Sequence, residues 1–222
     1  MTENVLVSAG LPPILLVDDS GSEFAILAAA LENSGWHVQS TNRAALTAVI
    51  GTIAPVSLVL LCNGELADSI AFASELRALS APNAAVPIIH VGADTPPKTD
   101  PKSSQVDAIL SMQGGIDSLV QQLESWRPVS LEPTRRIAEI FGAGPIAGMI
   151  ERLANRLEAA LVGLRHGEFD QGEAHRLAGL CGTLGFRQAH AAWLDLSLGD
   201  QAAVNEVRRT TRLTLAAIAH GL

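Results

Sequence analysis

The segment AHRLAGLCGTLG, residues 174–185, places a histidine and two glycines at helical spacing. At ~100° per residue, the apolar side chains share one face of such a helix, namely Leu177, Leu180, Cys181 and Leu184. His175, Gly179 and Gly182 share the opposite face. We therefore expect an exposed imidazole, which is a nucleophile in its neutral form, beside a surface that carries no side chains.

Two other interpretations of this segment stay open. An exposed histidine on a helix usually has no chemical role, and Gly179 and Gly182 could instead allow close helix packing. Each glycine inside a helix costs roughly 1 kcal/mol relative to alanine. A helix that carries this cost beside an exposed histidine favours a docking surface for a partner.

Further candidate residues follow short apolar runs in the first half of the chain. Runs without polar alternation are typical of strands buried on both faces, and they lie at 14–17, 57–62, 86–91 and 106–110, with a weaker candidate at 37–41. Helical stretches lie between them, at 23–33, 43–53, 65–79 and 115–126. This alternation predicts a doubly wound α/β fold with a parallel five-stranded sheet.

Ligands of such sheets bind at the carboxyl ends of the strands. The sequence places Asp18, Asp19, Cys62 and Gly92 there. Asp18 and Asp19 are candidates for such a site; alternatively, they mark a strand end followed by a helix cap. For Cys62, a half-buried, inert thiol is favoured over an activated one.

The second half predicts helices only. They are expected at 133–141, 146–165, 168–184, 186–198 and 201–220. Four substantial helices with short connections predict an all-α antiparallel bundle. Residues 1–127 carry 13 acidic and 5 basic side chains, whereas the remainder carries 10 of each. We therefore expect an α/β domain over 1–127, a linker over 128–132 and a four-helix bundle over 133–222.

Composition excludes several classes of protein. Two cysteines cannot form a disulfide framework or a zinc ribbon, and the net charge of −8 argues against nucleic-acid binding. No apolar run approaches the ~18 residues of a spanning helix. Residues 1–10 lack the basic residues and apolar core of a secretory signal. We therefore expect a cytoplasmic protein without membrane contact.

The first half resembles the receiver domains of response regulators, which have a flavodoxin-like fold. The resemblance covers residues 12–127. It rests on four segments: LLVDDS at 15–20, LVLL at 58–61, PII at 87–89 and VDAIL at 106–110. In that family an acidic pair helps bind Mg²⁺, and an aspartate after the third strand accepts the phosphoryl group. A hydroxyl residue follows the fourth strand, and a lysine follows the fifth.

This chain keeps the acidic pair, Asp18 and Asp19, and departs at the other three positions. The phosphoacceptor position falls on Cys62, the hydroxyl position on Gly92 and the lysine position near Met112. A thiol is a poor Mg²⁺ ligand, and phosphoryl transfer to a receiver needs a carboxylate nucleophile. The resemblance therefore implies a pseudo-receiver that cannot be phosphorylated. Three prolines between Thr95 and Pro101 predict a short or absent helix after its fourth strand.

The second half resembles histidine phosphotransfer (HPt) domains. This resemblance rests on the segments GLRHGEFD at 163–170, AHRLAG at 174–179 and GTLG at 182–185. The resemblance implies that His175 is the phosphoacceptor and that Gly179 admits a partner receiver, with Gly182, Arg176 and Ala178 on the same docking surface. The family usually has lysine where this chain has Ala178, so we expect Arg176, Arg187 or Arg165 to supply the missing cation.

These resemblances together predict a phosphorelay intermediate. His175 would carry a phosphoryl group between receivers of a hybrid histidine kinase and a response regulator, with Mg²⁺ supplied at the partner and no tightly bound cofactor in this chain. A binding module that sequesters a kinase or regulator is the alternative. The sequence shows no ATP-binding module, so we do not expect a complete kinase. The other histidines share no ligand spacing, and His166 and His190 are expected to be surface residues.

Overall fold

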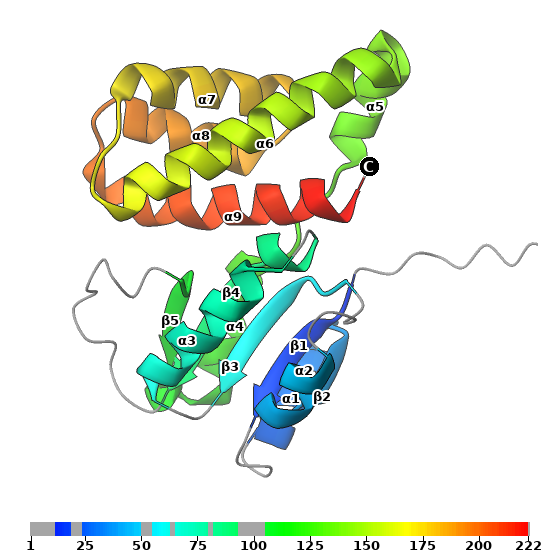
Figure 1. The fold of residues 1–222 in the computed structure, drawn as a ribbon, viewed down its shortest axis with the longest axis vertical. Helices are drawn as coiled ribbons and strands as arrows, with labels where there is room; N and C mark the ends of the chain where they lie inside the picture. Colours follow the sequence, from blue (N-terminus) through cyan, green and yellow to red (C-terminus); the bar gives the residue numbers. More distant parts are fainter. Residues whose placement is uncertain are drawn as a thin grey trace, which may run out of the picture.

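The structure is a computed structural model that describes residues 12–18, 24–49, 55–62, 65–79, 82–92 and 105–221, with backbone only for 47–49. It has an α/β part, residues 12–126, and a helical part, residues 132–221 (Figure 1). Asp19 and the proline-rich stretch from Thr95 to Pro101 lie outside the described residues. Of the described helices, none is both long and apolar enough to cross a membrane.

Within the described chain, five strands form one parallel sheet in the order β2-β1-β3-β4-β5. They are β1 (Ile14–Asp18), β2 (Val38–Thr41), β3 (Leu58–Cys62), β4 (Ile88–Gly92) and β5 (Ala108–Ser111). The central strands β1, β3 and β4 are almost entirely buried, because helices cover both faces of the sheet. This explains their continuous apolar sequences and confirms the predicted parallel α/β sheet.

The helices of the α/β part divide between the two faces. They are α1 (Phe24–Asn33), α2 (Arg43–Val49), α3 (Leu66–Arg77) and α4 (Gly115–Leu123). Leu27 of α1 and Leu119 of α4 pack with Leu60 on one face. Leu46 of α2 and Phe72 of α3 pack with Val59 on the other. Alternate residues of each strand therefore point into two separate apolar cores.

The helical part contains α5 (Glu132–Phe141), α6 (Ala143–Arg165), α7 (Gln171–Thr183), α8 (Arg187–Ser197) and α9 (Val204–His220). Two boundaries differ from those expected. The helix α6 begins before Pro145, because proline is tolerated in a first helical turn. The helix α7 begins at Gln171 and not at residue 168, because the Asp170 carboxylate caps it by accepting from the backbone N–H groups of Gly172 and Glu173.

The core of the helical part is a single apolar cluster from α6 to α9, including Leu157, Leu177, Cys181, Trp193 and Val207. A hydrogen bond holds the C-terminal end of α7 against α5. The Thr134 hydroxyl donates to the Leu184 carbonyl at 2.7 Å. Gly185 has φ +88° and approaches Pro133 so closely that a Cβ there would stand 2.7 Å from the proline side chain. The α7–α8 turn therefore requires glycine.

The helix α9 joins the two parts. Its Leu213 packs with Trp126 in a core of the α/β part, whereas Val207 and Leu215 belong to the helical core. Arg212 of α9 donates to Asp107, which precedes β5. Because α9 meets the amino ends of the strands, the carboxyl edge of the sheet points away from the helical part, as Figure 1 shows.

Candidate functional site

His175 lies in the second turn of α7 and is exposed, as the spacing predicted. Its neighbours Ala174 and Leu177 are buried in the helical core, so the imidazole is directed away from that core. The α/β part borders α9, whereas α7 lies on the other side of the helical part (Figure 1). The described part of the N-terminal half therefore leaves the imidazole open to a partner.

The two glycines of this face differ in their surroundings. A Cβ added to Gly179 would meet no atom within 4 Å in the described chain outside its own helix backbone. A Cβ added to Gly182 would stand 3.0 Å from Nδ1 of His190 on α8. Gly179 therefore leaves an open surface one turn from His175, whereas the missing side chain of Gly182 makes room for a neighbouring helix. The helix-packing interpretation therefore applies to Gly182, whereas the surface at Gly179 stays open in the described chain.

The prediction that His190 is a plain surface residue is wrong. Its ring is half-buried, and Nδ1 lies 2.9 Å from the carbonyl oxygen of Ala178. A carbonyl only accepts hydrogen bonds, so Nδ1 carries the proton in this contact. The His190 ring thus covers the C-terminal half of the α7 face. The surface without side chains is therefore limited to the region of Gly179.

Ala178 does not belong to the exposed surface on which we expected it. Its side chain is 1 % exposed and lies in the helical core. At ~100° per residue it falls between the His175 face and the core stripe, and the approach of α8 buries it. A cation near His175 must therefore come from another position.

Of the three expected substitutes for that cation, only Arg176 lies on α7 with His175. Arg165 is half-buried near Arg212, at the junction with the α/β part. Burial and the charge of Arg212 lower the pKa of Arg165. Arg187 is exposed at the start of α8, beyond the α7–α8 turn. Arg176 directly follows His175, and its side chain is 60 % exposed.

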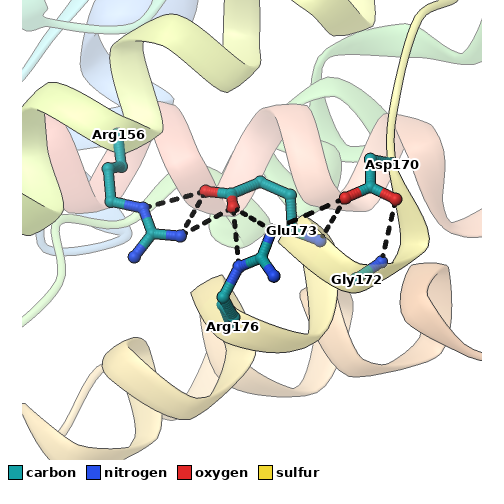
Figure 2. A network of polar contacts seen from close by, with 5 residues as sticks. All are labelled: Arg156, Asp170, Gly172, Glu173 and Arg176. Carbon is teal, nitrogen blue, oxygen red and sulfur yellow. Dashed lines mark hydrogen bonds and ion pairs between the residues drawn. The ribbon is translucent and has the colours of Figure 1, made fainter.

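Arg176 belongs to a cluster of four charged side chains at the start of α7, which we call the Arg176 cluster: Arg156, Asp170, Glu173 and Arg176 (Figure 2). Nε of Arg176 donates to Oε2 of Glu173 at 3.0 Å, and Nη2 lies 3.6 Å from Asp170. Arg156 of α6 donates to both carboxylate oxygens of Glu173 at 2.6 Å. Burial alone would raise the pKa of Glu173, but the hydrogen bonds from Arg156 and Arg176 hold it below its usual range.

The sequence analysis missed Glu173, Arg156 and Asp170. The pair Asp170 and Glu173 does have the spacing of a helix start, with a capping residue followed three positions later by glutamate. Glu173 and Arg176 also have the i,i+3 spacing of a helical ion pair. The contact with Arg156 spans two helices, so no local pattern indicates it.

The carboxyl edge of the sheet holds the residues at the other predicted site. Asp18 and Cys62 are paired in register across β1 and β3, and Gly92 and Met112 lie at the ends of β4 and β5. Cys62 is fully buried, deeper than the half-buried state expected, and burial, with the nearby charge of Asp18, raises the pKa of its thiol far above the usual range. This thiol is therefore not a nucleophile near neutral pH.

The space in which a side chain at position 92 would lie is filled by a neighbouring ring, which the sequence did not reveal. Nε2 of His90 lies 2.9 Å from the position that a Cβ on Gly92 would take, and Nδ1 lies 2.9 Å from the Ser69 hydroxyl oxygen. Burial, followed by the charge of Arg43, lowers the pKa of His90, so its ring is neutral. A serine or threonine at position 92 would require this ring to move. Among the residues described, no three His, Cys, Asp or Glu side chains group as a metal site.

No protein-family model matches the chain, and no curated protein matches it at a significant level. The interpretation of both sites therefore depends on the residues and geometry of this chain.

Proposed function

We propose that this protein is a phosphorelay intermediate whose His175 accepts a phosphoryl group from one receiver domain and donates it to another. The observation that carries the proposal is the exposed imidazole of His175 one turn from the open surface at Gly179. A helix face with a nucleophile and a missing side chain allows the active site of another protein to approach. The proposal identifies the helical part as an HPt-like bundle and locates the protein in the cytoplasm.

The transfer step needs little from this chain besides the nucleophile. A neutral imidazole nitrogen of His175 attacks the phosphorus of the partner's phosphoaspartate. The nitrogen–phosphorus bond forms, the bond to the aspartate oxygen breaks, and the partner recovers a free carboxylate. The partner receiver supplies Mg²⁺ for the charge on the transferring oxygens. The reverse reaction at a second receiver completes the relay.

We propose a regulatory or docking role for the α/β part, which we interpret as a pseudo-receiver. The buried thiol of Cys62 and the His90 ring beside Gly92 support this interpretation, because neither supplies a carboxylate nucleophile or a hydroxyl. Its carboxyl edge also points away from the helical part (Figure 1). Partners of this edge and of His175 would therefore bind at separate surfaces.

The pseudo-receiver interpretation predicts that acetyl phosphate with Mg²⁺ does not phosphorylate the α/β part. Phosphorylation is measured by intact mass on the His175→Ala variant, which removes the proposed phosphoacceptor. A receiver domain with a complete acidic site serves as the positive control. A phosphoryl group mapped to Asp18, Asp19 or Cys62 would show that the interpretation is wrong.

A binding module without chemistry is the second candidate function. It is favoured by the burial of Ala178, which removes the usual position of a cation beside the histidine. Such a module would sequester a histidine kinase or a response regulator through the same α7 face. The variant His175→Gln separates the two candidates, because it keeps a polar side chain of similar reach without the nucleophilic nitrogen.

The experiment incubates the protein with a ³²P-labelled phosphorylated receiver and Mg²⁺, and it measures both labelling and binding. The relay predicts acid-labile, base-stable label on the wild type, with background label on His175→Gln and His175→Ala. It also predicts that His175→Gln loses signal output in the cell. Retained output and unchanged binding without any label on the wild type would favour the binding module and reject the relay.

A further inference from the structure

The Arg176 cluster contains Arg176, the residue that directly follows the proposed phosphoacceptor His175 on α7. We propose that Glu173 is a positioning residue that holds the Arg176 guanidinium next to His175, and that Arg176 exchanges Glu173 for the phosphoryl group when His175 carries it. This inference rests on the proposed function, and it names the cation that replaces the lysine missing at Ala178. It assigns a further function to a network that also joins α6 to α7 and caps the start of α7 (Figure 2).

The geometry brings the guanidinium and the imidazole over the same helical turn. Nη1 of Arg176 lies 3.8 Å from the position that a Cβ on Gly172 would take. Helical side chains lean toward the N-terminus and cover the preceding turn, so His175 covers the turn that contains Gly172. The Cβ position on Gly172 would also stand 3.3 Å from Oδ2 of Asp170. Because Gly172 itself has no side chain, the turn leaves room for the Asp170 carboxylate and the Arg176 guanidinium beside the imidazole.

The hydrogen bonds show which contact can be exchanged. Arg156 makes three hydrogen bonds to Glu173 from α6, so this carboxylate stays in place if Arg176 leaves. Arg176 is 60 % exposed, and its carboxylate partners are Glu173 and the exposed Asp170. Exposed ion pairs contribute little to stability. Moving Arg176 therefore disturbs neither the α6–α7 contact nor the helical core.

The charge balance gives the exchange its direction. The cluster contains two arginines and two carboxylates, so its formal charge is zero. A phosphoryl group on His175 adds a charge of about −1.5 to −2 beside it. The mobile cation is then attracted to the phosphoryl oxygens and away from Glu173.

The test uses chemical phosphorylation, which needs no partner protein. Phosphoramidate transfers its phosphoryl group to an accessible imidazole and releases ammonia. The lifetime of the phosphoryl group on His175 is then measured by ³¹P NMR, after subtraction of the signal from His175→Ala. The variants are Arg176→Gln, Glu173→Gln and their double variant, with Arg156→Gln as the matched control that breaks only the α6 contact of Glu173.

We expect Arg176→Gln to shorten the phosphohistidine lifetime about threefold to tenfold, because the guanidinium no longer opposes protonation of the imidazole leaving group. Glu173→Gln should lengthen the lifetime about twofold, since it frees the cation and removes a repelling carboxylate. The double variant should match Arg176→Gln, and Arg156→Gln should match the wild type. A purely structural role would instead lower the thermal midpoint without this pattern of lifetimes.

Three results would overturn the inference. They are a wild-type lifetime in Arg176→Gln, an effect of Glu173→Gln that persists in the double variant, and a His175 that phosphoramidate does not modify. Failure of the relay is a separate result: a partner receiver that never transfers its label rejects the proposed function, while the lifetimes still report on Arg176 and Glu173.

Discussion

Replacing Gly179 with leucine is expected to lower the rate of transfer from a phosphorylated receiver by more than about 100-fold while the protein stays folded. A Cβ there meets no neighbour within 4 Å in the described chain, so we expect a leucine side chain to extend into the space that the partner must occupy. The unfolding free energy should even rise by roughly 0.8 kcal/mol, because leucine favours helix over glycine. The measurements are the initial rate of label transfer and the urea unfolding curve.

Gly144 provides a matched control for this substitution. It lies in the first turn of α6, and a Cβ added there also meets no atom within 4 Å in the described structure. Gly144→Leu therefore introduces the same exposed apolar side chain away from His175, and it should leave transfer unchanged. Equal transfer rates for Gly179→Leu and Gly144→Leu would contradict a docking role for the α7 face.

Replacing Asp107 with asparagine is expected to lower the free energy of unfolding by about 3–5 kcal/mol, because two buried guanidinium groups lose their shared counter-ion. Oδ2 of Asp107 lies 2.6 Å from Nη2 of Arg77, and Oδ1 lies 3.0 Å from Nε of Arg212. Oδ2 also accepts from the Ile88 backbone N–H at 2.8 Å. Burial lowers the pKa of Arg77 to about 10, even with Asp107 beside it, which shows how strongly this site disfavours an unpaired cation.

Acidification should reduce the stabilisation that Asp107 provides. Burial by itself would raise the pKa of Asp107, but Arg212 and Arg77 hold it below its ordinary value of 3.8. The stabilisation is therefore complete above pH 3.8 and is lost as the pH falls through the lower folded-state pKa. The difference in unfolding free energy between wild type and Asp107→Asn, measured by urea titration at several pH values, should shrink in this acid range.

The exposed pair of Glu124 and Arg127 is the control for Asp107. Both side chains are substantially exposed, so Glu124→Gln should cost less than about 1 kcal/mol. If Asp107→Asn lost no more unfolding free energy than Glu124→Gln, the two parts of the chain would be held together by apolar contacts such as that of Leu213. Because α7 lies away from this junction, labelling of His175 should persist in Asp107→Asn under folding conditions.

Local patterns predicted the elements of the fold and the exposure of His175. Short apolar runs predicted the strands, and the 3.6-residue period placed Leu177 and Cys181 in the core with His175 outside. These predictions succeed because each depends on residues a few positions apart. The parallel sheet with helices on both faces then follows from the alternation of strand and helix, whereas the order of the strands does not, because doubly wound sheets occur with more than one order.

Contacts between distant segments could not be predicted in this way. His190 packs on Gly182 from the next helix, Arg156 reaches Glu173 across α6 and α7, and Asp107 pairs with Arg212, which lies in the other half of the chain. Each contact depends on how whole helices are placed, which the spacing of residues along one helix does not determine. The burial of Ala178 has the same origin, because it depends on how closely α8 approaches α7.

The central claim is that one imidazole, that of His175, carries the phosphoryl group between receivers. The most direct measurement adds unlabelled second receiver to the ³²P-labelled protein and maps the label by mass spectrometry before and after. We predict a single modified residue, His175, whose label then moves to an aspartate of the second receiver. Label on one of the other five histidines, or equal labelling of His175→Ala and wild type, would contradict the account.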